Sequence, residues 1–222
     1  MTTFSEIRLH SSIKKSNLCN QNGGIDVKCA MLTNKEYDLV EKIRNGNTQA
    51  FSELVDSYKN LVYTLAHRML QNREEAEEVS QDAFIKVFNA LKHFKGDSKI
   101  STWIYRITYN TCLDRIKQNR KHSMFVDSER LEDFAFVDMN NALDKMLDDE
   151  RSALLAECLA KLPGKDAGLL TLFYFEGKSL LEMEKILEIP VNSIKVGLFR
   201  ARKKMAKILE GNLKREILEN NG

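Results

Sequence analysis

Proline and glycine are scarce in this chain of 222 residues, which has two prolines and ten glycines. These residues make most of the tight turns that connect antiparallel strands, so their scarcity argues against a turn-rich β fold. Apolar residues make up 43% of the chain and charged residues 30%, the balance of a globular protein that can bury a core. Long uninterrupted helices are therefore expected.

Signatures of metal binding and catalysis are also missing. Cys19, Cys29, Cys112 and Cys158 form no CxxC pair, and no histidine stands at ligand spacing to them. The sequence contains no Gly-rich phosphate loop, no HExxH, no GxSxG and no Glu-x-x-His pair of the kind used by metal-binding helical bundles. We expect no metal, no cofactor and no enzyme activity.

Long apolar runs are absent as well. None approaches the roughly 20 residues that cross a membrane, and the N-terminus lacks the apolar core of a signal peptide, so a cytoplasmic protein with reduced thiols is expected. Residues 1–32 are polar and aperiodic and are expected to be poorly ordered. Translation beginning at Met31 is one hypothesis, which the intact mass of the native protein tests. A functional tail carrying Cys19 and Cys29 is the alternative.

Charge is distributed unevenly although the net charge is only +2. Residues 99–121 contain six Lys or Arg and one acidic residue, and residues 191–215 contain eight Lys or Arg and one acidic residue. Between them, residues 127–150 carry nine acids and two bases. Two basic segments separated by an acidic one indicate a polyanion that is held at two places.

The first two helices are predicted from capping and periodicity. Thr33 and Glu36 fit a capping box in front of a short helix that ends near Arg44. Apolar residues at helical spacing across 51–69 predict a long helix that faces a core.

A third helix is expected after Asn72, which can cap it, and early acids complement its dipole. Ile85 lies outside the apolar stripe, beside Gln81 and Asp82, which indicates a protein-contact face. The stripe itself consists of Ala76, Val79, Ala83, Phe84, Val87, Phe88 and Leu91.

A fourth helix is predicted from Ile100 to about Lys121, with one apolar stripe formed by Ile100, Trp103, Ile104 and Ile107. Off this stripe lie Tyr105 and Tyr109 among several cations. Aromatic faces interleaved with cations suit a single nucleic-acid strand, because rings stack on bases and cations neutralise phosphates. The alternative is an ordinary amphipathic helix with a solvated basic face.

The second half begins with residues 124–139, which fit no period and indicate a linker. A helix is expected from about residue 140 to Leu162, where Pro163 and Gly164 stop it. Ser179 with Glu182 forms a capping box for a short helix, and after a break at residues 188–190 a basic helix follows. This pattern predicts a helix-turn-helix whose second helix meets DNA, and a plain helical hairpin is the alternative.

Two sets of motifs resemble bacterial sigma factors of the extracytoplasmic-function (ECF) type, in the sigma-70 family. Residues 78–88 (EVSQDAFIKVF), 94–98 (FKGDS) and 102–107 (TWIYRI), with Asn110, look like their region 2. Leu162-Pro163, residues 174–177 (YFEG) and the helix-turn-helix ending in FRAR look like their region 4. The resemblance covers about residues 35–209.

The resemblance implies an all-α fold of two small helical domains, a region 2 helical bundle and a region 4 helix-turn-helix domain, joined by an acidic linker. The expected boundaries are an N-terminal extension over 1–32, region 2 over 33–122, the linker over 123–139, region 4 over 140–212 and a C-terminal tail over 213–222.

The resemblance also implies three contact surfaces, for core RNA polymerase and for two promoter elements. The clamp coiled coil of the polymerase would be bound by Glu78, Gln81, Asp82, Phe84, Ile85 and Lys86. The melted −10 element would be bound by Lys95, Ser98, Trp103, Tyr105, Arg106, Tyr109, Asn110, Asp114, Arg115, Lys117, Asn119 and Arg120. The −35 element would be bound by Asn192, Ser193, Lys195, Val196, Phe199, Arg200, Arg202 and Lys203. An anti-sigma factor is a further implied partner, and no membrane insertion of the chain itself is expected.

Four positions depart from the pattern of these sigma factors. Glu184 replaces a small residue, Val196 and Gly197 replace a frequent Ser-Arg pair, and Gly168 replaces a frequent Arg. Because a polar contact and a phosphate-binding charge are lost, we expect weaker or altered recognition of the −35 element. Restoring Arg at position 197 should raise promoter affinity and steepen its salt dependence.

A stand-alone helix-turn-helix regulator is the main alternative. It explains residues 179–205 but neither the helix of Trp103 nor the motif around Gln81. Pull-down of core polymerase separates the two.

Overall fold

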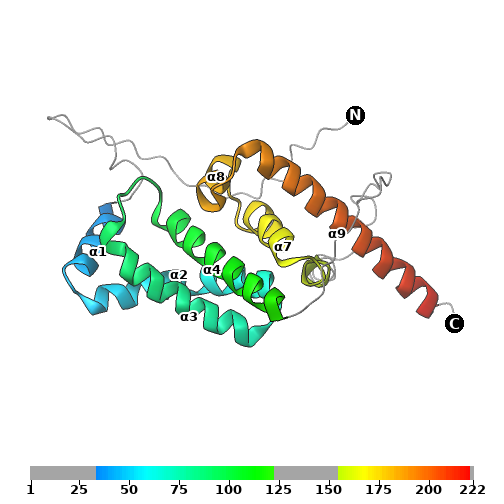
Figure 1. Ribbon diagram of the computed structural model, residues 1–222, viewed down its shortest axis with the longest axis horizontal. Helices are drawn as coiled ribbons and strands as arrows, with labels where there is room; N and C mark the ends of the chain where they lie inside the picture. Colours follow the sequence, from blue (N-terminus) through cyan, green and yellow to red (C-terminus); the bar gives the residue numbers. More distant parts are fainter. Residues whose placement is uncertain (1–33, 123–154, 221–222) are drawn as a thin grey trace.

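The computed structural model describes residues 34–122 and 155–220 (Figure 1). The expectations for the N-terminal extension, the start at Met31, the cap at Thr33, the linker, and the helix before residue 155 lie outside the described residues. The same holds for the side chains of Arg120 and of residues 213–220.

The N-terminal bundle consists of four helices. They are α1 (Asn34–Arg44), α2 (Thr48–Leu70), α3 (Arg73–Ala90) and α4 (Ile100–His122), with a 3₁₀ turn at Leu91–His93. The long helices α2, α3 and α4 pack against one another, and α1 packs on α2 (Figure 1). The described residues contain no strand, so the all-α expectation is confirmed for this part of the chain.

Asparagine caps start the two long helices α2 and α3. Asn47 accepts a hydrogen bond from the Ala50 amide at 3.0 Å, and Asn72 accepts one from the Glu75 amide at 3.0 Å. Each side chain satisfies an amide that has no partner within the helix. The predicted role of Asn72 is confirmed.

One apolar cluster fills the outer part of the bundle, with α1, α2, α3 and α4 all contributing. It contains the buried Val40, Ile43, Ala50, Leu54, Val62, Ala83, Val87, Leu91, Phe94, Ile100 and Ile104. Phe88 was expected in this core, and that prediction is wrong, because its side chain is 45% exposed. Its ring instead meets the ring of Phe51 edge-on, with 4.8 Å between centroids.

The C-terminal unit begins in helical residues 155–160 and continues through α7 (Gly164–Leu170), a π-helical turn (Thr171–Phe175) and α8 (Leu180–Leu187). After residues 188–190, α9 (Val191–Asn220) completes the predicted helix-turn-helix. α9 extends through residues 213–220, which the sequence assigned to a tail. The helix simply continues, since no proline interrupts it.

The two parts are in direct contact. α7 packs on α2, and α8 packs on α4 (Figure 1). A second apolar cluster crosses this boundary without a break. From the N-terminal bundle it takes Leu65, Ala66, Met69, Ala76, Val79, Tyr105, Tyr109 and Cys112, and from the C-terminal unit it takes Cys158, Leu159, Leu162, Ala167, Leu169, Leu170, Leu172, Met183, Ile186, Leu187, Ile194, Leu198, Ala201, Met205 and Leu209.

Candidate nucleic-acid and protein interfaces

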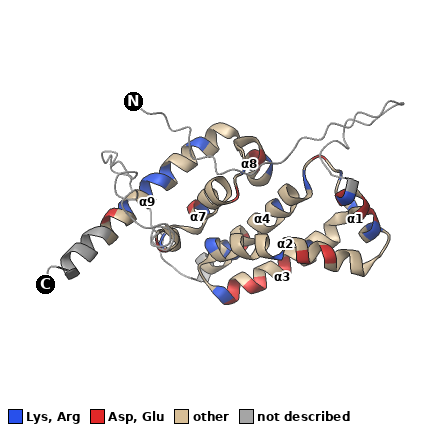
Figure 2. Ribbon diagram, turned by 180° about the vertical axis from the view of Figure 1, so that it is seen from behind, with Lys and Arg blue, Asp and Glu red and all other residues tan. Residues whose placement is uncertain are grey.

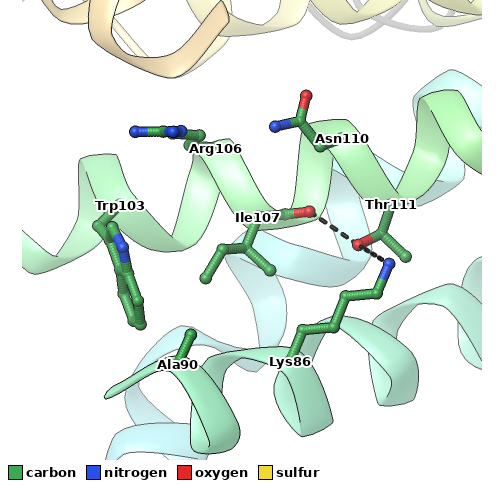
Figure 3. A pocket seen from close by; sticks show the side chains of 7 residues that line it. All are labelled: Lys86, Ala90, Trp103, Arg106, Ile107, Asn110 and Thr111. Atoms are coloured by element: carbon green, nitrogen blue, oxygen red, sulfur yellow. Dashed lines mark hydrogen bonds between the residues drawn. The ribbon is translucent and has the colours of Figure 1, made fainter. Parts of the chain in front are cut away.

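An open pocket of about 310 Å³ lies between α3 and α4 (Figure 3). The Lys86 ammonium donates a hydrogen bond to Thr111 Oγ1 at 3.2 Å, and the Thr111 hydroxyl donates to the Ile107 carbonyl at 2.8 Å. The Trp103 indole forms one wall, and Arg106 and Asn110 extend from the same helix (Figure 3). The lining consists of Lys86, Ala90, Trp103, Arg106, Ile107, Asn110 and Thr111. An aromatic wall, an amide and two cations suit a nucleotide base and its phosphate.

Lys86 was assigned from the sequence to the polymerase surface. The structure places its ammonium in the pocket instead, on the side of α3 that faces α4. Glu78, assigned to the same surface, forms an ion pair with Arg115 of α4 at 2.8 Å. Both side chains therefore contact α4. The spacing of residues along α3 does not by itself distinguish these two from the neighbouring residues that face outward.

The remaining polymerase-binding candidates lie on the outer surface of α3. Gln81, Asp82 and Ile85 are exposed, and Phe84 is half-buried. The exposed Phe88 extends this apolar strip by one turn. Sequence reasoning missed Phe88 because its spacing also fits the core stripe, although an aromatic ring one turn from Ile85 is the signal that could have found it.

Two of the aromatic residues predicted to stack on bases are covered. Tyr105 is 1% exposed and Tyr109 is 3% exposed. Burial, together with a hydrogen bond that the Tyr105 hydroxyl donates to the Glu176 carboxylate, raises the pKa of Tyr105 well above its ordinary value. The expectation that both rings lie on an open face is wrong for this arrangement, because the C-terminal unit packs over them.

The cations of α4 are engaged at both ends of the helix. Arg106 pairs with Glu188 at 2.5 Å, and Lys99, at the start of the helix, pairs with Glu182 at 3.2 Å. Further along, the Asn119 amide donates to the Glu75 carboxylate at 2.9 Å. Asp114 and Lys117 pair within the helix at 3.8 Å.

The loop before α4 contributes two further candidates. Lys95 is exposed and Ser98 is half-buried. The ring of Phe94 lies against that of Trp103, with 4.9 Å between centroids, which fixes the loop beside the pocket wall. The structure thus brings Trp103, Arg106 and Asn110 together in the pocket lining, and Lys95 and Ser98 lie in the loop that precedes α4.

The start of α9 is held by α8. Glu184 accepts a hydrogen bond from the Val191 amide at 3.2 Å. The carboxylate that departs from the sigma-factor pattern has therefore found a partner, because it caps an amide at the start of the second motif helix.

One face of α9 is buried and the opposite face is open. Ile194, Leu198 and Ala201 are buried. Arg202 donates a hydrogen bond to the Tyr174 hydroxyl at 3.1 Å, and Lys203, half-buried, also has an interaction partner. Basic residues recur along the helix (Figure 2). The open face consists of Asn192, Ser193, Lys195, Val196, Phe199 and Arg200.

Gly197 lies at the edge of that face. A Cβ atom there would be 3.1 Å from Leu169 Cδ1. An arginine at this position therefore requires Leu169 to shift, so the substitution is not a simple addition of charge.

Neither described range, 34–122 or 155–220, contains a cluster of His, Cys, Asp and Glu arranged for a metal. Within the same ranges no helix is both long and apolar enough to span a bilayer. Burial raises the pKa of the Cys112 thiol to about 12, so this cysteine is not a nucleophile at neutral pH.

A base-sized pocket on one helical part and a helix-turn-helix on the other define a DNA-binding protein with two separate contact sites. Comparison with known families agrees. Residues 54–122 match sigma-70 region 2, and residues 152–205 match sigma-70 region 4. The chain belongs to the sigma-70 family of RNA polymerase sigma factors, which are transcription initiation factors.

Its relatives are sigma factors of the ECF type. The chain is 33% identical to the ECF sigma factor SigW of Bacillus subtilis, over 77% of this chain and 94% of SigW. It is 34% identical to the sigma-H factor of Pseudomonas aeruginosa, over 81% of this chain and 97% of that factor. It is 33% identical to the ECF sigma-E factor of Escherichia coli, over 74% of this chain and 88% of that factor. The chain therefore directs polymerase to promoters, with region 2 acting at the −10 element and region 4 at the −35 element.

Solved structures agree on the fold. CnrH, in complex with the cytosolic domain of CnrY, superposes with a TM-score of 0.53 at 20% identity, over 78% of this chain and 96% of that one. RpoE of Bartonella quintana, in complex with the anti-sigma factor NepR, superposes with a TM-score of 0.54 at 18% identity, over 72% of this chain and 96% of that one.

Proposed function

We propose that the pocket between α3 and α4 holds an unpaired base of the −10 element. The Trp103 indole supplies a stacking surface, and the Asn110 amide supplies a donor and an acceptor for a base edge. Lys86 and Arg106 supply positive charge beside it. The presence of these four side chains in the lining of one open pocket is the observation that carries the proposal.

The open face of α9 is the proposed −35 surface. Asn192, Ser193 and Lys195 lie in its first turn, where a recognition helix contacts base edges. Arg200 lies one turn further and would meet phosphate. Among the described residues neither Lys195 nor Arg200 has an ion-pair partner, so both charges remain available for DNA.

The outer strip of α3, formed by Gln81, Asp82, Ile85 and Phe88, is the proposed polymerase contact. An apolar strip with a carboxylate at its edge suits a protein surface rather than DNA. An apolar strip on a helix packs well against another helix, as in a coiled coil.

Run-off transcription with core polymerase and a promoter library tests these assignments. Asn110→Ala should lower transcript yield roughly tenfold, since one well-placed base contact is worth about 1–3 kcal/mol.

Ile85→Asp should abolish polymerase binding, and Arg200→Ala should weaken promoter binding on all sequences. Lys59→Ala is the matched control, because this exposed cation of α2 pairs, among the residues that the structure describes, with Asp56 alone. Wild-type yield from Asn110→Ala would refute the pocket assignment.

An anti-sigma factor is the further proposed partner. RpoE of Bartonella quintana was solved in complex with the anti-sigma factor NepR, and CnrH was solved in complex with the cytosolic domain of CnrY. In this chain Tyr174, Phe175 and Leu181 are large exposed apolar residues of the C-terminal unit, which suits a protein partner. We also propose that the protein acts in the cytoplasm, beside the polymerase, and has no enzyme activity of its own.

A further inference from the structure

Arg44, the last residue of α1, is bonded to the segment that connects α3 to α4. Its guanidinium donates one hydrogen bond to the Leu91 carbonyl at 3.3 Å and another to the Phe94 carbonyl. The remaining guanidinium nitrogen pairs with the Glu41 carboxylate at 2.6 Å, within α1. Leu91 begins the 3₁₀ turn after α3 and Phe94 directly follows that turn, so one side chain is bonded to both of its ends.

The positions of these carbonyls make the bonds favourable. A carbonyl at the carboxyl end of a helix carries partial negative charge and has no amide of a following turn to bond it. Leu91 and Phe94 are both buried, and a buried carbonyl without a donor is costly. A guanidinium has several donors in fixed directions and can bond both carbonyls and a carboxylate at once, whereas a lysine ammonium cannot reproduce this geometry.

Phe94 connects Arg44 to the pocket between α3 and α4. Its ring lies against the Trp103 indole, with 4.9 Å between centroids, and that indole forms one wall of the pocket (Figure 3). Phe94 is buried in the apolar cluster that also contains Val40 and Ile43 of α1, and Trp103 packs against the same cluster. The hydrogen bonds of Arg44 fix the Phe94 backbone and the cluster fixes its ring. Together they determine where the indole lies.

We propose that Arg44 is a positioning residue of the −10 pocket: by bonding the two carbonyls before α4, it holds the Trp103 indole where it stacks on an unpaired base. The inference rests on the proposed −10 role of this pocket. Arg44 is not part of the pocket lining, so it acts through Phe94 and Trp103 without touching DNA. It also precedes residues 54–122, which match sigma-70 region 2, so a helix outside the matched residues takes part in base recognition.

Trp103 is the only tryptophan of the chain, so its fluorescence reports on the pocket wall alone. Arg44→Lys keeps the positive charge beside Glu41 but cannot bond both carbonyls. In the free full-length protein it should increase quenching of Trp103 by acrylamide and shift the emission to longer wavelength. Arg73→Lys is the matched control and should change neither, because this exposed arginine pairs with Glu77 in the first turns of α3, at the opposite end from Leu91.

Binding of the holoenzyme to a fork-junction promoter, whose −10 strand is already unpaired, tests the consequence for DNA. The promoter is one selected from the library of the run-off experiment. Arg44→Lys should weaken binding roughly tenfold, about the contribution of one stacked base. On the same template with abasic sites in the −10 strand, wild type and Arg44→Lys should bind equally, because no base remains to stack. A general loss of stability would instead weaken binding to both templates.

Arg44→Met removes all three hydrogen bonds and should show larger effects, and Arg44→Lys decides the matter where Arg44→Met does not fold. Unchanged quenching in Arg44→Lys, unchanged binding to the intact template, or an equal loss on the intact and abasic templates overturns the inference. Wild-type transcription from Asn110→Ala would instead overturn the −10 assignment and leave the quenching result standing, so the two failures are distinguishable.

Discussion

Val196 gives α9 a hydrocarbon side chain in the middle of its proposed DNA-binding face. It is 48% exposed, and the exposed Asn192 and Phe199 flank it at helical spacing, four residues before it and three after it. A β-branched side chain has no donor or acceptor for a base edge, but its methyl groups fit the C5-methyl group of thymine in the major groove. We therefore propose that Val196, which departs from the sigma-factor pattern, replaces a polar contact with an apolar one.

Removing one methyl group from DNA tests this contact. Replacing the thymine opposite Val196 by deoxyuridine should weaken wild-type promoter binding about threefold to fourfold, because a buried methylene-sized group is worth about 0.8 kcal/mol. Val196→Ser should bind thymine and uridine duplexes equally. Electrophoretic mobility of holoenzyme complexes measures both. An equal penalty in the two proteins would show that Val196 does not touch the base.

Two substitutions at Gly197 distinguish the effect of added charge from the effect of added side-chain volume on promoter binding. Gly197→Arg should steepen the salt dependence of promoter binding by about one phosphate contact, whereas Gly197→Ala should leave the slope unchanged. Both variants place a Cβ near Leu169, so their difference isolates the guanidinium. Titration of binding from low to moderate salt measures the slopes. Identical slopes would exclude a phosphate within reach of this position.

At the scale of single elements, α8 is a helix of eight residues, and its stability depends on its cap. Ser179 accepts a hydrogen bond from the Glu182 amide, and the Glu182 carboxylate accepts one from the Ser179 amide at 3.0 Å. Burial opposes ionisation of Glu182, but hydrogen bonds from Ser179 and Lys99 outweigh it, so the pKa of Glu182 lies below its ordinary value. The cap therefore works in the ionised state.

Ser179→Ala should lower the free energy of unfolding by about 1 kcal/mol. Glu182→Gln should show the pH dependence. A carboxyl whose pKa is lower in the folded state stabilises the fold above its unfolded pKa, near 4.3, and this contribution disappears as pH falls through the lower folded pKa. Urea unfolding should therefore show a difference in the free energy of unfolding between wild type and Glu182→Gln at pH 7, and this difference should disappear in acid. A difference independent of pH would assign the effect to packing.

At the scale of the whole molecule, the two sigma regions are matched as separate families, yet the chain gives them a shared apolar cluster. Gln71 marks the boundary: it ends α2 in the left-handed region, with φ of 56°, and its side chain donates to the Leu162 carbonyl at 2.5 Å. The two parts should therefore unfold together.

Differential scanning calorimetry measures whether the two parts unfold in one transition or in two. The wild type should melt in one transition, and Gly164→Ala/Gly168→Ala in two, one for each part. A Cβ atom at Gly164 of α7 would lie 2.0 Å from the Met69 carbonyl oxygen of α2, and one at Gly168 would lie 3.0 Å from Met69 Sδ, so the variant loses the shared apolar contact without losing either helix. Gly211→Ala should keep the single transition, because a Cβ there meets no atom within 4 Å. Two transitions in the wild type would show that the parts are energetically independent despite their contact.

The sequence by itself determined the elements and the family. Periodicity and caps, which act within about ten residues, predicted α2, α3, α4 and the helix-turn-helix, and the motifs around Gln81, Trp103 and Arg200 indicated the sigma factor. Such signals are local, and α4 and α8 begin where they were expected.

Only the tertiary structure decided which faces of those helices are open. Tyr105 and Tyr109 are covered because α7 and α8 pack on α4, Lys86 turns into the α3–α4 pocket, and Phe88 leaves the core for the surface. Two glycines that look unremarkable in the sequence, Gly164 and Gly168, lie so near α2 that a Cβ atom on either would crowd Met69. Burial depends on partners that lie far away along the chain, and a helical period specifies an apolar face without specifying what covers the opposite one.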